Sequence, residues 1–145
     1  MIDTLKNDLK VAMKARDKTR LSTLRMILSV AKNEQIAKGA ELTAEDFITL
    51  LTRQAKQRRE SAEQFRAGGR DEMADQEEAE LLVIQDYLPK QLSEDDVRAL
   101  IADIIAETGA EGPRGMGKVM GPLSAKIRGK FDGKRASALV KEALT

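Results

Sequence analysis

Lysine and arginine side chains are concentrated near the end of the sequence, where residues 112–145 carry eight bases and only two acids. Such side chains attract phosphate groups through their charge. The bases that we expect to act together are Lys118, Lys126, Arg128, Lys130, Lys134 and Arg135. Only Phe131 lies among them to stack on a nucleotide base, and its place between two apolar stripes favours a core position. The cluster is therefore suited to phosphates and nucleic-acid shape rather than to a base sequence. A solvated basic surface is the alternative interpretation.

Four glycines accompany these bases, at Gly115, Gly117, Gly121 and Gly133. The run Gly115-Met-Gly-Lys-Val-Met-Gly121 has the glycine spacing of a loop whose backbone N–H groups approach an anion. A P-loop, however, requires Ser or Thr after its lysine, and here Val119 follows Lys118. The preceding Gly-Ala-Glu-Gly-Pro-Arg is unsuited to the strand that a Rossmann loop requires. The pattern favours glycines that permit close helix packing over a nucleotide site.

Charges of opposite sign flank the Gly68-Gly69 pair. The bases before and beside it are Lys56, Arg58, Arg59, Arg66 and Arg70. The acids after it are Asp71, Glu72, Asp75, Glu77, Glu78 and Glu80. In an antiparallel helical hairpin the two sets would face each other and form ion pairs. A carboxylate site for Mg²⁺ or Mn²⁺ is the alternative, but a helical di-iron centre would need a His three residues after a Glu. The sequence therefore favours ion pairs and predicts no metal site.

The chain contains no histidine and no cysteine. Catalytic triads, HExxH zinc sites, imidazole acid–base catalysis and thiolate chemistry are therefore excluded. Carboxylates, lysines, hydroxyl groups and Tyr87 are the remaining reactive groups. We accordingly predict no catalytic residue and no cofactor, and a protein that is not an enzyme.

These side chains must be positioned by helices, because apolar residues recur at helical spacing and no stretch alternates long enough to predict a strand. Aromatic residues make up only 3% of the chain, so the core is built from aliphatic side chains. We predict an all-α fold of seven helices. Four are expected to begin at the N-caps Asp17, Thr43, Ser93 and Asp132. Expected ends are Gly39, Gly68-Gly69, Pro89 and Gly109.

The 145 residues suffice for one domain or two small subdomains. Pro89 and the following Lys-Gln-Leu form the predicted boundary, between a four-helix N-terminal part (residues 1–91) and a three-helix C-terminal part (residues 92–145). The longest charge-free run, Val119 to Ala125, is too short for a membrane span. Because the N-terminus alternates charges instead of forming an apolar leader, a cytoplasmic location is expected.

Four stretches of this sequence resemble the YqeY family of small bacterial proteins. They are Ala15-Arg-Asp-Lys-Thr-Arg-Leu-Ser-Thr-Leu-Arg25, Gln57-Arg-Arg-Glu-Ser-Ala-Glu-Gln-Phe-Arg66 with Gly69-Arg-Asp71, Tyr87-Leu-Pro89, and the glycine run with Asp132-Gly-Lys134. Residues 92–145 are also similar to the tail domain of the B subunit of the tRNA-dependent amidotransferase. The resemblance implies an all-helical fold with a three-helix tail.

In the amidotransferase the tail contacts tRNA, while the catalytic machinery lies in other domains and subunits that this chain lacks. The resemblance implies a structural role for Gly115, Gly117, Gly121 and Gly133. It also implies tRNA contacts for Lys118, Lys126, Lys130 and Lys134. A family label of carbon–nitrogen ligase activity with glutamine as amido donor comes with the resemblance, without support from the residues. Pro122 departs from the expected pattern, and we expect it to break or kink its helix.

The leading hypothesis is a non-catalytic tRNA-binding module that contacts RNA phosphates through its basic C-terminal helices. The alternative is a protein-interaction module that docks onto an aminoacyl-tRNA synthetase or the amidotransferase. In that alternative the basic N-terminal helices or the acidic fourth helix would form the contact. Neither hypothesis involves DNA or a membrane.

Overall fold

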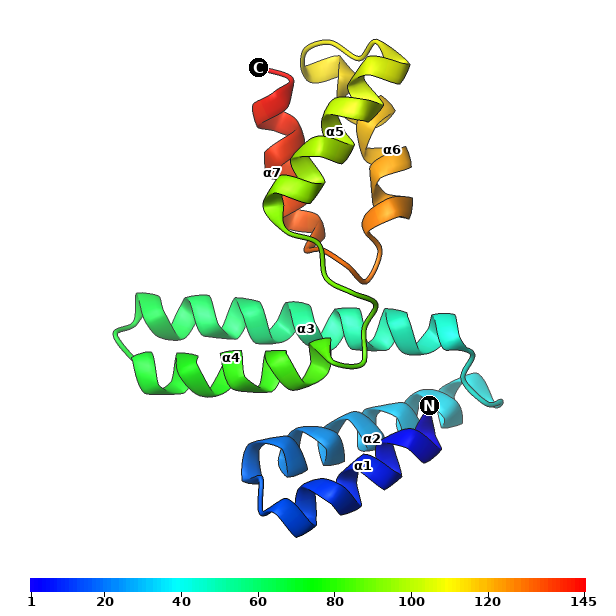
Figure 1. Cartoon of the computed structure of the whole chain (residues 1–145), viewed down its shortest axis with the longest axis vertical. Helices are drawn as coiled ribbons and strands as arrows, with labels where there is room; N and C mark the ends of the chain where they lie inside the picture. Colours follow the sequence, from blue (N-terminus) through cyan, green and yellow to red (C-terminus); the bar gives the residue numbers. More distant parts are fainter. The chain divides into compact units, whose positions relative to one another are not determined.

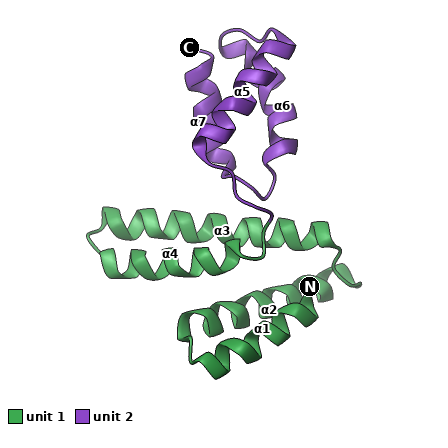
Figure 2. Ribbon diagram, in the orientation of Figure 1, with its two compact units in different colours: residues 1–88 green, residues 89–145 purple.

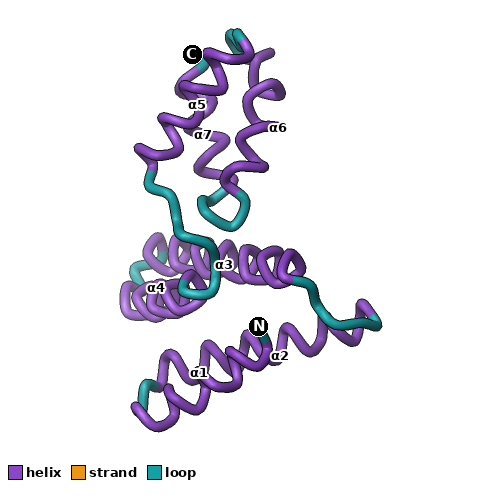
Figure 3. Tube along the Cα trace, turned by 45° about the vertical axis from the view of Figure 1, so that its right-hand side comes forward, coloured by secondary structure: helices purple, strands orange, loops and turns teal.

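The computed structural model describes residues 1–145 and is entirely helical (Figures 1 and 3). Seven α-helices and one 3-10 turn follow in order: α1 (Ile2–Ala15), α2 (Lys18–Lys38), α3 (Ala44–Ala67), α4 (Asp71–Gln85), α5 (Glu94–Thr108), η1 (Pro113–Gly115), α6 (Met116–Ile127) and α7 (Gly133–Ala143). The predicted all-α fold of seven helices is confirmed. The short turn η1 was not predicted. None of the helices combines the length and the apolar composition that crossing a bilayer requires.

Local side-chain chemistry explains where the helices begin. Thr43 and Ser93 each accept a hydrogen bond from the backbone N–H of an aspartate three residues later, and that aspartate bonds back to the cap N–H. Asp17 and Asp132 accept the N–H of Arg20 and Arg135 in the same way. All four predicted N-caps are confirmed, because capping depends on residues only three positions apart.

The chain divides into two compact units, residues 1–88 and 89–145 (Figure 2). The division falls directly before Pro89, where the predicted boundary segment begins, and three residues before residue 92. Hydrogen bonds of two residues explain why this segment belongs to the second unit. The Gln91 side chain donates to the Gly129 carbonyl at 2.8 Å, and the Leu92 N–H donates to the Lys130 carbonyl at 2.8 Å. The segment that precedes α5 is therefore bound to the second unit.

The first unit consists of two helical hairpins, α1 with α2 and α3 with α4 (Figure 1). A single aliphatic core joins them, with the large, fully buried side chains of Leu5, Leu24, Ile27, Leu51 and Ile84 at its centre. Phe47 is its one buried aromatic residue. Residues from all four helices contribute, so α1 and α2 are held against the second hairpin by apolar packing.

Polar contacts at the end of α4 add to this packing. The Tyr87 hydroxyl donates to Asp8 Oδ2 of α1 at 2.5 Å. Arg20 of α2 donates to Asp86 Oδ2 at 2.9 Å. Burial and the hydrogen bond to Asp8 raise the pKa of Tyr87 to about 12. The last residues before the second unit are thereby tied to both helices of the first hairpin.

The second unit is a three-helix bundle with its own core, in which Ile101, Ile104, Val119, Leu123 and Leu139 are almost completely buried. Phe131 packs against this cluster, as predicted. The two units have separate sets of core residues.

The connection from α5 to α6 depends on glycine conformations. Gly109 ends α5 at φ 66°, and Gly112 has φ 58° and ψ −169°, a region open almost only to glycine. Gly115 then lies against Ala110, where an added Cβ would come within 3.0 Å of the Ala110 Cβ. This close approach fixes the start of α6.

The expected break at Pro122 is wrong, since α6 continues unbroken from Met116 to Ile127. A proline normally disfavours the helical conformation of the residue before it by clashing with that residue's Cβ. Here the preceding residue is Gly121, which has no Cβ. Pro122 still lacks the N–H that the Lys118 carbonyl would accept within the helix.

Candidate nucleic-acid interface

The predicted basic residues lie on α6, on the turn after it and at the start of α7. Lys118 and Lys126 are exposed on α6, Lys130 is half-buried in the turn, and Lys134 is exposed in the first turn of α7. None of these four lysine side chains has a hydrogen-bond or ion-pair partner within the chain. Arg128 is also exposed and makes an interaction within the chain. We call Lys118, Lys126, Lys130 and Lys134 the tail lysines.

The backbone that carries the tail lysines is well fixed at the turn. Lys130 N–H donates to the Ile127 carbonyl at 2.8 Å, and the Lys130 carbonyl accepts the Leu92 N–H. Gly129 is buried with φ 73°, and its carbonyl accepts the Gln91 amide. The turn therefore presents Lys130 from a hydrogen-bonded backbone rather than from an open loop.

The outer face of α6 carries several small residues. Val119, Leu123 and Ile127 point into the core, and the opposite face carries small exposed residues at Gly117, Gly121, Ser124 and Ala125. Lys118 lies on this outer face beside them. A partner's backbone can come close to the helix there because few side-chain atoms stand in the way.

Three of the four glycines do not pack closely. An added Cβ at Gly117, Gly121 or Gly133 would meet no atom within 4 Å. A close approach is observed only at Gly115, against Ala110 in the connection between α5 and η1. The expectation that the glycines of the run Gly115 to Gly121 permit close helix packing is therefore wrong at Gly117 and Gly121. Gly121 is needed next to Pro122 for the steric reason given above, and the other two are exposed.

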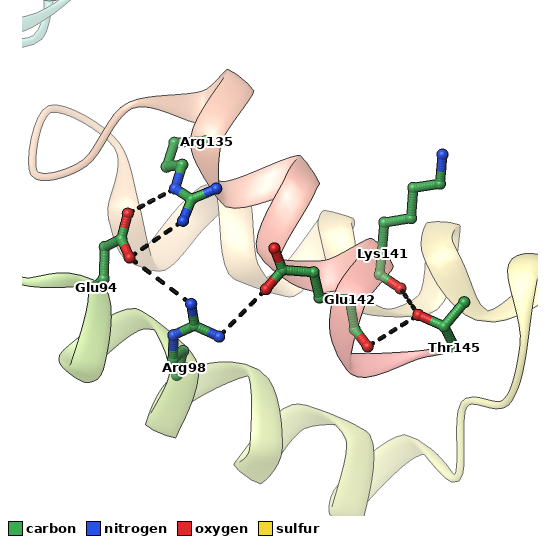
Figure 4. A network of polar contacts seen from close by, with 6 residues as sticks. All are labelled: Glu94, Arg98, Arg135, Lys141, Glu142 and Thr145. Carbon is green, nitrogen blue, oxygen red and sulfur yellow. Dashed lines mark hydrogen bonds and ion pairs between the residues drawn. The ribbon is translucent and has the colours of Figure 1, made fainter.

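Arg135, one of the predicted bases, is paired with an acid of the chain. Its Nε and Nη2 donate to Glu94 Oε1 and Oε2 at 2.5 and 3.2 Å (Figure 4). Arg98 continues the network from Glu94 to Glu142, with an Nη1–Oε2 distance of 3.3 Å to the latter. These contacts lower the pKa of Glu94, mainly through the hydrogen bond from Arg135. Arg135 thus joins α7 to α5, and its guanidinium is occupied by an acid of the chain.

The acidic α4 pairs with α3, as predicted. Arg66 lies within 3.7 Å of Asp71 and within 2.9 Å of Asp75 and Glu78. Arg58 lies 2.9 Å from Glu80 and 3.6 Å from Glu77. No three acidic side chains are grouped so that they could hold a metal ion.

A second basic surface lies on α2, and the sequence analysis did not single out its residues. Lys18, Arg25 and Lys32 are exposed at intervals of seven residues, which places them on one face of the helix. The seven-residue spacing of these bases is the signal in the sequence that indicates such a face.

Comparison with known proteins assigns the family. The model of the Yqey-like protein family matches residues 2–144, so the chain belongs to the YqeY-like family. This agrees with the resemblance found in the four sequence stretches.

Curated relatives include fungal proteins named "Altered inheritance of mitochondria protein 41, mitochondrial". The protein of Lachancea thermotolerans is 33% identical over 115 residues, covering 77% of this chain and 62% of the relative. That of Pyrenophora tritici-repentis is 29% identical, covering 99% and 81%. That of Clavispora lusitaniae is 38% identical, covering 61% and 51%. In two of these three cases the chain spans less than two thirds of the relative's length.

Proposed function

We propose that this protein is a non-catalytic tRNA-binding module that contacts RNA phosphates through its C-terminal helices. The observation that carries the proposal is the set of tail lysines. They are four cations without partners in the chain, gathered on α6, the following turn and the start of α7. An unneutralised basic surface of this kind binds a polyanion by releasing its counterions.

The outer face of α6 supports close contact with the RNA backbone. Gly117 and Gly121 place no side chain between the helix and a partner. Because Phe131 packs into the core, no aromatic side chain is available here to read bases. Binding is thus expected to follow shape and phosphate rather than sequence.

The resemblance to the amidotransferase tail supports tRNA as the ligand. In this proposal the protein acts in the cytoplasm. The module would present tRNA to translation enzymes such as an aminoacyl-tRNA synthetase or the amidotransferase. In this proposal no reaction, cofactor or metal belongs to the chain itself. The carbon–nitrogen ligase label would describe the larger enzyme whose tail this unit resembles.

The test is a tRNA titration of the full chain at low and at physiological salt. The variant Lys118→Ala/Lys130→Ala/Lys134→Ala removes three tail lysines. A matched control, Lys56→Ala/Arg70→Ala/Lys90→Ala, removes three exposed bases elsewhere and changes the net charge equally. The slope of log affinity against log salt is negative. We expect the first variant to reduce its magnitude by about 2, since each lost phosphate contact accounts for about 0.7–0.9.

The proposal also requires that the loss be similar for different tRNAs. Equal affinities of the tail-lysine variant and the matched control would overturn it. Strong discrimination between tRNAs by the wild-type chain would overturn the claim that phosphates and shape are recognised.

A second candidate function, docking onto a translation enzyme, is favoured by an apolar groove between α5 and α7. The groove has a volume of about 480 Å³ and is lined by Ile101, Ala102, Ile105, Ala106, Leu139 and Ala143, with Arg98 and Glu142 also bordering it. Purified synthetase or amidotransferase, treated with ribonuclease, should then bind the wild-type chain. Ala102→Arg/Ala106→Arg should lose that binding. Ala125→Arg, on the exposed face of α6, is the control.

A further inference from the structure

The exposed face of α2 carries an ordered row of basic and hydroxyl side chains. Lys18, Ser22, Arg25, Ser29 and Lys32 follow one another at alternating spacings of four and three residues, and all are exposed. The three bases are seven residues apart, so they stand about 10.5 Å from one another along the helix axis. We call these five residues the α2 stripe.

Folding of the first unit does not require the α2 stripe. The opposite face of α2 supplies the core, through Leu24, Ile27, Leu28 and Ala31. The bases of the stripe have no hydrogen-bond or ion-pair partner in the chain. Replacing them should therefore leave the packing of the unit intact.

The acids nearby in sequence are engaged elsewhere. Asp8 accepts the Tyr87 hydroxyl, Asp17 caps α2 by accepting the Arg20 N–H, and Glu34 pairs with Arg53 of α3 at 3.0 Å. Asp3, at the far end of α1, is the remaining acid among residues 1–38. Asp8 and Asp17 keep their charge because their donors are neutral, but residues 1–38 hold nine bases and only four acids, so positive charge is in excess there.

Helix α1 extends the positive surface. It runs beside α2 in the first hairpin (Figure 1), and its Lys10 and Lys14 are exposed without partners. Arg16, in the turn between the two helices, is exposed as well. Exposed bases of the hairpin thus occur on both helices and in their connection.

We propose that the α2 stripe is a second contact surface for the phosphate backbone of tRNA, in addition to the tail lysines. This inference rests on the proposed function. The bases supply charge, and the Ser29 hydroxyl donates a hydrogen bond to a phosphate oxygen between them, whereas the Ser22 hydroxyl donates to the Thr19 carbonyl at 3.1 Å within α2. Each of the two units would then carry a phosphate-binding surface of its own.

The composition of the stripe favours RNA over an anionic membrane. A helix that lies on a membrane exposes a continuous apolar face between its bases. On α2 the residues between the bases are serines, and the apolar face is buried in the core. The exposed Ile36 is a single residue at the end of the row.

The test uses the full chain and tRNA, with three variants compared in parallel. Lys18→Ala/Arg25→Ala/Lys32→Ala removes the bases of the stripe. The tail-lysine variant and the matched control Lys56→Ala/Arg70→Ala/Lys90→Ala are those described above. The stripe variant should reduce the magnitude of the slope of log affinity against log salt by about 2. The control should change this slope little. Circular dichroism and thermal unfolding verify that each variant is folded.

A second measurement locates the RNA directly. Because the chain has no cysteine, Ser29→Cys introduces a single thiol into the stripe, to which a short photocrosslinker is attached. Gln76→Cys on the exposed acidic face of α4 is the control. We expect tRNA to crosslink to position 29 and not to position 76.

The outcomes separate this inference from the proposed function. Loss of binding only in the tail-lysine variant, without crosslinking at position 29, overturns the second surface and leaves the proposed function standing. Loss only in the stripe variant supports the α2 surface and overturns the role of the tail lysines. Absence of tRNA binding by the wild-type chain overturns both. A membrane result would also overturn the second surface. In that case phosphatidylglycerol vesicles would bind the wild-type chain but not the stripe variant, and they would displace tRNA from the wild-type chain.

Discussion

Arg135 and Glu94 form a bidentate pair that joins the first turn of α7 to the first turn of α5. The two hydrogen bonds are parallel, a geometry that the planar guanidinium matches better than a lysine could. Both side chains are nearly half exposed, so solvent weakens the pair. Its importance is therefore one of orientation, since it holds the Arg135 guanidinium on Glu94 of α5.

Replacing Arg135 should affect stability and leave RNA binding nearly unchanged. We expect Arg135→Ala to lower the Tm slightly and to keep the affinity for tRNA within about twofold of wild type. Lys134→Ala, one position earlier, should keep the Tm and weaken binding. Thermal unfolding and tRNA titration of the two variants provide the comparison. A larger loss of affinity for Arg135→Ala than for Lys134→Ala would contradict this assignment.

The pair also predicts a dependence of stability on acid. Because Arg135 lowers the pKa of Glu94 in the folded state, the stabilisation is complete above the ordinary value of 4.5. It is lost as the pH falls through the lowered pKa. The Tm difference between wild type and Glu94→Gln should be largest near neutral pH and shrink in acid, measured by thermal unfolding across that range.

Tyr87→Phe removes the hydroxyl that donates to Asp8. A partly buried hydrogen bond to a charged acceptor accounts for about 1–3 kcal/mol, and we expect urea unfolding to show a loss in that range. Tyr87 is the only tyrosine and the chain has no tryptophan, so ultraviolet absorbance reports this side chain alone. Its titration should centre near pH 12. Since the folded pKa is raised, stability should persist to about pH 10 and decline above it.

Two glycine variants should change stability in opposite directions. Gly112→Ala places a Cβ in a backbone conformation that only glycine adopts readily, at a cost of about 1–3 kcal/mol. Gly117→Ala fills open space within a helix and should stabilise by about 0.5–1 kcal/mol. Urea unfolding measures both. Stabilisation by Gly112→Ala would show that the turn before η1 has another conformation.

Glu77 and Glu80 should differ although both approach Arg58. Burial raises the pKa of Glu77, with the charge of Glu80 adding to the effect, so its ionised form is disfavoured in the folded protein. Glu77→Gln should therefore not lower the Tm at neutral pH. Glu80→Gln removes the shorter ion pair and should lower it. As the pH falls through the raised pKa, wild type should gain stability relative to Glu77→Gln.

The sequence predicted features that depend on near neighbours along the chain. Thr43 and Ser93 were found as caps because their partners lie three residues away. The ion pairs of Arg66 were found because a glycine turn of known position brings α4 back along α3. Both kinds of feature follow from local spacing.

Features set by distant contacts were predicted less well. Glu94 lies 41 residues from Arg135, and nothing near Arg135 in sequence indicates that partner. The sequence also shows glycines without showing whether a neighbour is close, so Gly115 and Gly117 looked alike. Pro122 is an exception, because the residue that lets its helix continue is its immediate neighbour, the glycine before it.

The hydrogen bonds of Gln91 and Leu92 have a mechanical consequence. They join the chain segment that enters the second unit to the turn that carries Lys130. A ligand that pulls on this turn therefore transmits tension straight to the connecting segment, without first loading α5 or α7. Force on the turn that carries Lys130 and force on the link between the two units therefore act through the same two hydrogen bonds.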